Sequence, residues 1–140
     1  MKAATVHQLK KELQLRSHEE LVEISLRLSK FKKENKDLLT YLLFEVDDEA
    51  AYILSVKEEV EQKFADINAT TFYYIKKSVR KILSDVKRHI RYSKKKETEV
   101  ELLLHFCAHL LKMKPNYRRN TVLINLYERQ LSAINKAILT

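Results

Sequence analysis

Residues 71–92 read TFYYIKKSVRKILSDVKRHIRY, and this pattern predicts one long amphipathic helix. At 100° per residue, the apolar side chains gather on one side of the helix. They are Phe72, Ile75, Val79, Ile82, Leu83, Val86 and Ile90. Twenty-two residues make a helix roughly 33 Å long, at 1.5 Å per residue. This periodicity is typical of a helix that packs its apolar side against a core.

The composition extends the helical prediction to the whole chain. The 140 residues include no Gly and only one Pro, Pro115. Sheets and long ordered loops usually need Gly at tight turns and bulges, whereas helices lose stability from it. We therefore predict an all-α protein with short connections. The length suits a single domain over residues 1–140.

Apolar periodicity and end signals predict seven helices. They cover residues 5–15, 17–31, 36–46, 48–67, 71–92, 99–113 and 121–140, with ends that are approximate. Thr98 and Glu101 have capping-box spacing, so Thr98 is expected to cap the sixth helix. The third helix is apolar over most of its circumference, which predicts a central, buried position.

Two arrangements of these helices are compatible with the sequence. One is a compact bundle, and the other is a short α-α superhelical stack of antiparallel hairpins. Residues 32–44 and 94–106 resemble each other weakly, since each has a lysine-rich joint followed by an apolar helix. Such an internal echo is the pattern expected of a stack.

The charge is unevenly distributed along the chain. The net charge is +8, but residues 46–68 carry two bases and seven acids, or −5. The next stretch, residues 69–96, carries ten bases and one acid, or +9. An acidic helix is thus followed directly by a very basic one.

The bases of residues 71–92 lie on the side of the helix roughly opposite its apolar side, and they continue into the lysine loop at 93–96. A basic stripe that includes an aromatic ring has the chemistry for phosphate contacts and base stacking. The candidate residues for nucleic-acid binding are Tyr73, Lys77, Arg80, Lys81, Lys87, Arg88, Arg91, Lys94, Lys95 and Lys96. Two alternatives are a solvated polar face and pairing with the acids of residues 48–67.

A second candidate site is a set of three side chains spaced i, i+4 and i+8. Glu101, His105 and His109 share one face of a predicted helix, and such residues can bind a divalent metal. The metalloprotease pattern needs Glu directly after the first His, where this chain has Phe106. We therefore expect the polar face of a helix, with no metal and no cofactor. Cys107 lies on the apolar side and is expected to be a buried, inert thiol.

Little in the sequence supports catalysis. The absence of Gly excludes a Gly-rich phosphate loop and a G-x-S-x-G elbow. The remaining histidines, His7, His18 and His89, are expected on surface turns among charged residues. We predict that the protein is not an enzyme and has no small-molecule substrate.

The location and function follow from these observations as expectations. The single Cys suits a reducing compartment, and no apolar run approaches 18 residues, so we expect a cytoplasmic protein with no membrane partner. The predicted function is a non-catalytic helical module that binds another protein or forms a homo-oligomer. The alternative is nucleic-acid binding through the basic face of residues 71–92 and the 93–96 lysine loop.

Overall fold

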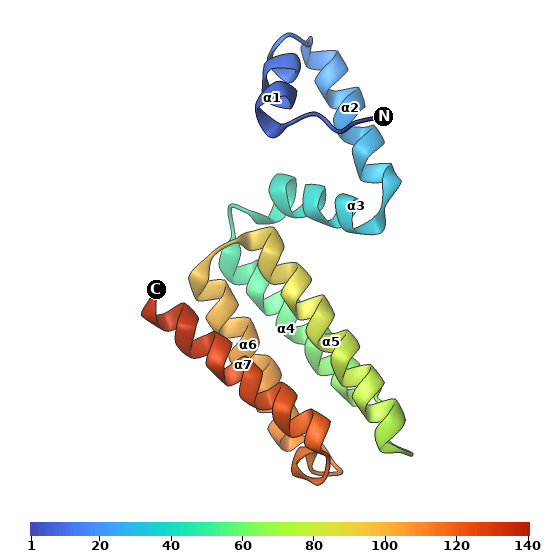
Figure 1. The fold of residues 1–140 in the computed structure, drawn as a ribbon, viewed down its shortest axis with the longest axis vertical. Coiled ribbons are helices and arrows are strands. Elements are labelled where there is room, and N and C mark those ends of the chain that lie inside the picture. The colour runs from blue at the N-terminus through green and yellow to red at the C-terminus, as the bar shows by residue number, and fades with distance from the viewer. The chain divides into compact units, whose positions relative to one another are not determined.

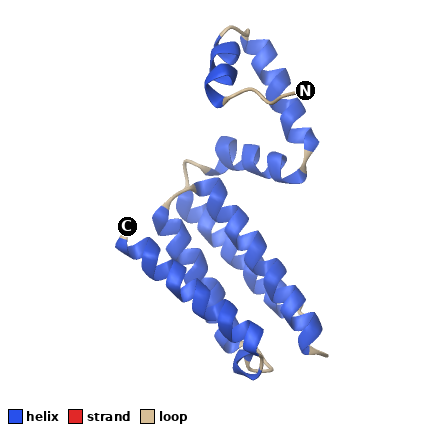
Figure 2. Cartoon of the chain, viewed as in Figure 1, coloured by secondary structure: helices blue, strands red, loops and turns tan.

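A computed structural model describes residues 1–140 and confirms the all-α fold, with no strand (Figure 2). Its helices are α1 (Val6–Gln14), α2 (His18–Phe31), α3 (Lys33–Thr40), α4 (Glu49–Ala65), α5 (Phe72–Ser93), α6 (Lys96–Lys112) and α7 (Thr121–Leu139). A π-helical turn covers Tyr41–Glu45, and a 3-10 turn covers Tyr117–Arg119. The number of helices agrees with the prediction.

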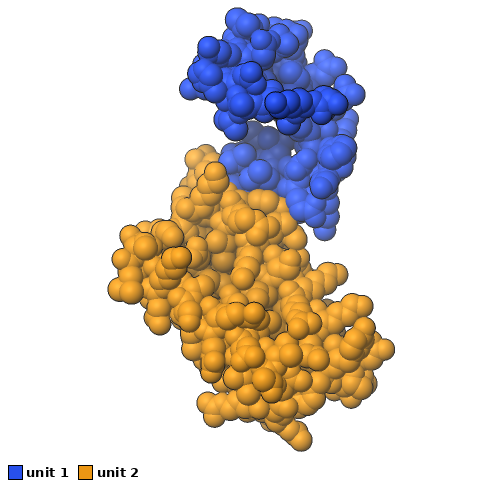
Figure 3. Space-filling model, in the orientation of Figure 1, with its two compact units in different colours: residues 1–43 blue, residues 44–140 orange.

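The chain divides into two compact units, residues 1–43 and residues 44–140 (Figure 3). We name them unit 1 and unit 2. Unit 1 contains α1, α2 and α3, and unit 2 contains α4 to α7. The single domain expected for residues 1–140 stays a prediction.

Unit 1 is held by local interactions and has almost no core. α2 packs on α3, and Ser29 is the one buried residue of its three helices. Capping boxes at Thr5 and Ser17 begin α1 and α2, because each side chain accepts a hydrogen bond from the backbone N–H three residues later. Most of the apolar side chains of unit 1 are therefore left exposed.

The third predicted helix is not buried, contrary to the expectation. Leu38, Leu42 and Leu43 are exposed, and Leu43 has 62% of its surface accessible. Leu39 is half-buried, and Tyr41 is the one buried side chain of this segment. The helix also begins earlier, at Lys33, and changes to a π-helical turn at Tyr41. The physical reason is size, since a unit of 43 residues offers too little surface to cover an apolar helix on every side.

Unit 2 contains the main core, and consecutive helices in it run in opposite directions (Figure 1). α6 packs against α4, α5 and α7, so it is the central helix of this bundle. The largest fully buried side chains are Ile75, Val79, Val86, Leu102, Phe106, Leu110 and Leu123. Each apolar side chain of this size stabilises the fold by roughly 1.5–3 kcal/mol relative to an exposed one.

The long helix of residues 71–92 forms as predicted and includes Ser93. Its predicted apolar side faces the core: five of its members are buried, and Phe72 and Ile90 are half-buried. Thr71 caps the helix by accepting a hydrogen bond from the backbone N–H of Tyr74. Lys94 ends it in the left-handed conformation, with φ 60°.

The predicted cap of the sixth helix is wrong. α6 begins at Lys96, and Lys95 occupies the cap position without a side-chain hydrogen bond. Thr98 is instead fully buried, and its hydroxyl donates to Glu49 Oε2, as does the hydroxyl of Ser93. A buried hydroxyl needs a partner, and the carboxylate of Glu49 from the first turn of α4 supplies it. This contact links α4 to the joint between α5 and α6.

Candidate functional site

The basic residues of α5 lie on its outer side, as the helical wheel predicts. Seven exposed bases on α5, in the following joint and at the first position of α6 have no acidic side chain within ion-pair distance. We name this set the basic face, and its members are Lys77, Arg80, Lys81, Lys87, Arg91, Lys94 and Lys96. Its charge is available to an anionic partner.

The acids of α4 do not neutralise the basic face. Glu59 lies 3.5 Å from the Lys63 ammonium and 3.2 Å from His89 Nε2. Glu61 lies beside two imidazoles of α6. The Asp66 carboxylate accepts a hydrogen bond from Gln62 on the same helix. Intramolecular pairing with the acidic helix therefore does not account for the basic stripe.

Two of the candidate bases serve the fold instead. Arg88 donates to Asp85 at 2.9 Å, and Lys63 of α4 donates to the same carboxylate at 2.7 Å. Partial burial acts to raise the pKa of Asp85, but the hydrogen bonds from Lys63 and Arg88 outweigh it and lower the pKa. Lys95 lies 3.7 Å from the carboxylate of Glu49. Neither base belongs to the basic face.

Exposed aromatic rings lie at the start of α5. Tyr73 has 65% of its surface accessible, and its ring meets that of Tyr74 edge-on with the centroids 5.3 Å apart. Tyr92, by contrast, is buried near the end of the helix, where its ring lies 5.7 Å from that of His89. The helix thus offers stacking groups at its first turn and cations along the rest of its outer side.

The histidines of α6 lie together, but with a different carboxylate from the predicted one. The rings of His105 and His109 have centroids 4.5 Å apart. Glu101 points elsewhere and accepts a hydrogen bond from Lys57 at 3.2 Å. Glu61 takes its place, with Oε1 3.5 Å from His105 Nε2 and 3.8 Å from His109 Nε2. We name Glu61, His105 and His109 the histidine cluster.

Helical spacing could not identify Glu61. Spacing finds neighbours on one helix, whereas Glu61 approaches His105 and His109 only because α4 packs against α6. The only signal for Glu61 in the sequence is that α4 is rich in acidic residues. A helix face exposed to solvent has the same composition, so this signal does not identify a ligand. The three ligand atoms of the histidine cluster all lie within 4.8 Å of one another.

The other single residues of interest are placed as follows. His7 and His18 are exposed, as expected, but they lie in α1 and α2 rather than on turns. His89 is half-buried on α5, so the prediction of a surface turn is wrong for it in both respects. The Tyr52 hydroxyl donates to the backbone carbonyl of His89 at 2.9 Å, and burial lowers the pKa of the imidazole. Cys107 is buried as predicted, and burial raises the pKa of its thiol to about 11.

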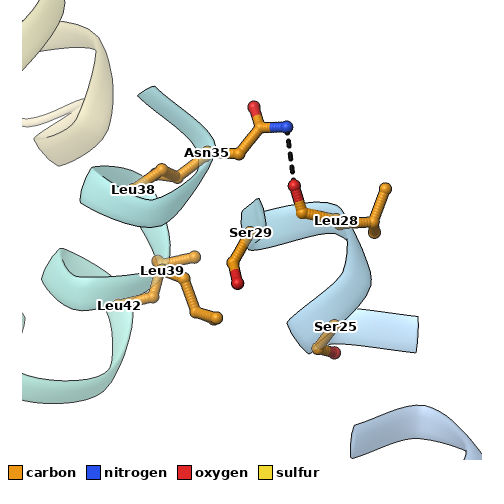
Figure 4. Close-up of a pocket in the computed structure, with 7 residues that line it drawn as sticks. All are labelled: Ser25, Leu28, Ser29, Asn35, Leu38, Leu39 and Leu42. Carbon is orange, nitrogen blue, oxygen red and sulfur yellow. Dashed lines mark hydrogen bonds between the residues drawn. The ribbon is translucent and has the colours of Figure 1, made fainter. Parts of the chain in front are cut away.

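Unit 1 contains an open apolar groove of about 270 Å³ between α2 and α3 (Figure 4). It is lined by Ser25, Leu28, Ser29, Asn35, Leu38, Leu39 and Leu42. The Asn35 side chain donates to the backbone carbonyl of Leu28 at 2.9 Å and so fixes one rim of the groove. The leucines give it an apolar floor without a charged group.

No helix of the chain has both the length and the apolarity that crossing a bilayer requires. Comparison with protein-family models, curated proteins and solved structures finds no match. A function must therefore be inferred from the geometry and chemistry of the surfaces described above.

Proposed function

We propose that the chain is a non-catalytic helical interaction module whose basic face binds the sugar-phosphate backbone of nucleic acid. The observation that supports the proposal is that seven exposed bases, on the outer side of α5, in the joint after it and at the start of α6, have no acidic partner. A solvated helix needs polar residues but gains nothing from bases alone, since like charges repel one another. A polyanion relieves that repulsion and releases its own counterions.

The spacing of the bases suits successive phosphates. Arg91 lies eleven positions after Arg80 on the same helix, a span of roughly 16 Å at 1.5 Å per residue, and Lys87 lies between them. Arginine binds phosphate oxygens in a bidentate fashion, and lysine binds them as a point charge. Phosphate contacts carry no sequence information, so we expect binding that is independent of base sequence.

The tyrosines at the start of α5 favour single strands over duplexes. Tyr73 is exposed one turn before Lys77, and a base can stack on its ring only when it is unpaired. Stacking of one base on an aromatic side chain contributes roughly 1–3 kcal/mol. We therefore expect a single strand to bind more tightly than a duplex of equal length.

Fluorescence anisotropy with a labelled oligonucleotide tests the proposal. If six phosphates are contacted, log affinity should fall with log salt with a slope of about −5 for a duplex, and less steeply for a single strand. The triple variant Arg80→Ala, Lys87→Ala, Arg91→Ala should bind more weakly and reduce the magnitude of the slope by about 3. Equal binding by the parent and this variant would overturn the proposal.

A matched control separates the basic face from net charge. The variant Lys30→Ala, Lys33→Ala, Lys36→Ala removes the same charge from exposed positions of unit 1. It should retain the affinity and salt slope of the parent. A loss equal to that of the α5 variant would indicate attraction by overall charge rather than by the basic face.

Protein binding, the first expectation from the sequence, is a second candidate function, and here a second copy of the chain is the proposed partner. Unit 1 exposes the apolar stripe of α1, in which Val6 and Leu9 have 83% and 50% of their surface accessible. It also exposes the groove between α2 and α3. An apolar helix and an apolar groove are complementary, and two copies related by a two-fold axis can exchange them reciprocally.

Light scattering over a range of protein concentrations tests self-association. The parent should form a dimer, and the variant Leu9→Glu, Leu13→Glu should be monomeric. Both leucines are exposed, so the substitutions leave the existing core intact. Lys10→Glu, Lys11→Glu on the polar side of α1 is the control and should remain dimeric. A parent that is monomeric at every concentration would exclude this second candidate.

A further inference from the structure

We propose that Glu61, His105 and His109 form a binding site for a divalent transition-metal ion of the Zn²⁺ type, between α4 and α6 of unit 2. The site is independent of the basic face and of self-association. It uses two imidazole nitrogens and one carboxylate oxygen, a donor set that suits zinc and its neighbours in the first transition series.

The distances fit the coordination geometry of zinc. In a tetrahedral site with bonds of about 2.0–2.1 Å, neighbouring ligand atoms lie about 3.3 Å apart. Glu61 Oε1 lies 3.5 Å from His105 Nε2 and 3.8 Å from His109 Nε2. All three atoms lie within 4.8 Å of one another. Side-chain rotations that shorten these separations would bring the three atoms to bonding distance of one ion.

The surrounding structure positions the ligands. His105 and His109 are one turn apart on α6, the central helix of unit 2, so their spacing is fixed by the backbone. The ring of Phe64 stacks on His109 with the centroids 5.6 Å apart and the planes 24° apart. Phe64 in turn contacts the buried ring of Phe106. A ligand held in this way loses little freedom when it binds a metal.

The ring of His105 makes a backbone contact that a bound ion would replace. His105 Nε2 lies 3.5 Å from Glu61 Oε1, on the side where the ion would be bound. His105 Nε2 also lies 3.2 Å from the backbone carbonyl of Lys57. Metal binding would replace this contact, and the ring proton would then sit on Nδ1.

The nearby positive charges are partly neutralised. The Lys57 ammonium lies 3.2 Å from the Glu101 carboxylate, and the Lys63 ammonium lies 2.7 Å from Asp85. Lys112, together with Glu61 and His109, lines an open groove of about 410 Å³. Zinc is usually four-coordinate, and the three side chains leave one position open. A water molecule from this groove can fill that position.

The position of the site defines its effect on the protein. An ion bound by Glu61 on α4 and by two residues of α6 joins the two helices. Because the unfolded chain does not hold these residues together, the ion binds the native state preferentially and stabilises it by mass action. Mg²⁺ and Ca²⁺ prefer oxygen ligands and are not expected to bind two imidazoles.

Calorimetric titration of the full chain, purified without a histidine tag, with ZnCl₂ tests the site. We expect one ion per chain and a melting temperature that rises with Zn²⁺ concentration but not with Mg²⁺. Substituting Co²⁺ should give the visible absorption of a tetrahedral site. The proposal would be overturned if Zn²⁺ binding did not saturate. It would also be overturned if a variant without the histidine cluster still bound one ion per chain.

Three variants assign the ligands. Glu61→Gln and His109→Ala should each weaken Zn²⁺ binding by at least about tenfold. Loss of a residue that only hydrogen-bonds a metal ligand already weakens binding by about 10- to 100-fold, and these residues are direct ligands. Glu101→Gln should leave affinity unchanged, which separates the observed cluster from the ligand set suggested by helical spacing. Glu61 is exposed and Gln preserves its shape, so this variant keeps the proposal testable if His109→Ala does not fold. Equal affinity of Glu61→Gln and the parent would exclude Glu61 as a ligand.

Discussion

A single carboxylate, that of Glu49, connects three segments of unit 2. Its Oε2 accepts hydrogen bonds from the hydroxyls of Ser93 and Thr98, which lie on either side of the joint between α5 and α6. Lys95 in the same joint lies 3.7 Å from its Oε1. The contact fixes where α6 begins, and it explains why Thr98 is buried rather than exposed as a cap.

Removing this carboxylate should destabilise the protein. Glu49→Ala leaves the buried Thr98 hydroxyl without its acceptor, and an unsatisfied buried polar group costs roughly 1–3 kcal/mol. Urea unfolding should show a lower midpoint with an unchanged slope. Glu58→Ala, an exposed position on the same helix, serves as the control and should shift the midpoint little.

Two half-buried histidines should make stability depend on pH. Burial lowers the pKa of His89 and of His105 below the ordinary value of 6.5, even though Glu59 and Glu61 act to raise them. At a pH between the folded and unfolded pKa values, the unfolded chain binds more protons than the folded one. The free energy of unfolding is therefore highest above pH 6.5 and decreases as the pH falls below 6.5. Urea midpoints on both sides of pH 6.5 should show this loss.

The variant His89→Gln should reduce this pH dependence without abolishing it, because His105 retains its own contribution. The titratable and charged groups that contact or act on His89 are Tyr52, Glu59, Arg88 and Lys63. The parent and His89→Gln both retain them, so the difference in pH dependence reports His89. A slope identical to that of the parent would mean that His89 is equally protonated in the folded and unfolded states.

The thiol of Cys107 should be unreactive in the native protein. Burial raises its pKa to about 11, so almost none of it is thiolate at neutral pH. A thiol reagent should modify the native chain slowly and should react fully once denaturant is added. Rapid modification of the native protein would show that α6 opens locally at this position.

At the scale of single residues, the sequence identifies side chains but not their partners. Tyr73 and the bases of the basic face that lie on α5 follow from helical periodicity, because the apolar stripe identifies the buried side and leaves the opposite side to solvent. Glu61 replaces Glu101 in the histidine cluster because α4 supplies it from outside α6. Contacts between helices depend on packing, which periodicity does not determine.

At the scale of elements, the end of α5 presents a backbone conformation that disfavours lysine. Lys94 has φ 60°, where a side chain costs roughly 1–2 kcal/mol relative to Gly. Part of this gain is offset because Gly makes the unfolded chain more flexible and so loses more entropy on folding. Lys94→Gly should therefore raise stability by about 0.5–1 kcal/mol. Thermal unfolding measures the change.

Lys87→Gly is the matched control, since it removes the same charge from an exposed position in the middle of α5. It should lower stability by about 1 kcal/mol, the usual cost of Gly inside a helix. If both variants lose stability to the same extent, the left-handed turn at Lys94 contributes no strain.

The predictability of the helices depends on how much each relies on its neighbours. The boundaries of α5 were predicted almost correctly, because its period and its Thr71 cap are local properties. α6 begins before its apparent Thr98 cap, because Glu49 offers that hydroxyl a buried partner. The apolar circumference of α3 indicated burial, yet unit 1 is too small to provide it.

At the scale of the whole molecule, the two units should differ in independent stability. Unit 2 has a continuous core around α6, whereas unit 1 has helices of 9, 14 and 8 residues and one buried residue among them. Isolated helices shorter than about 12–15 residues are marginal in water. A fragment of residues 44–140 should therefore unfold cooperatively, and residues 1–43 alone should show little helix by circular dichroism.

The absence of Gly and the near absence of Pro were enough to predict an all-α fold, because they remove the residues that tight turns require. The division after residue 43 was not predicted, since no linker composition marks it. The division falls inside an apolar segment. Apolar residues ordinarily indicate one continuous buried helix and not a boundary between two units.

The central position of α6 has a consequence for solvent access to the backbone. Because α6 packs against α4, α5 and α7, we expect most of its amide groups to exchange only when the whole of unit 2 opens. Deuterium uptake should therefore be slowest in α6, while the ends of α7 and the helices of unit 1 exchange early. The exchange rate of α6 then reports the global stability of unit 2 under native conditions, without any denaturant.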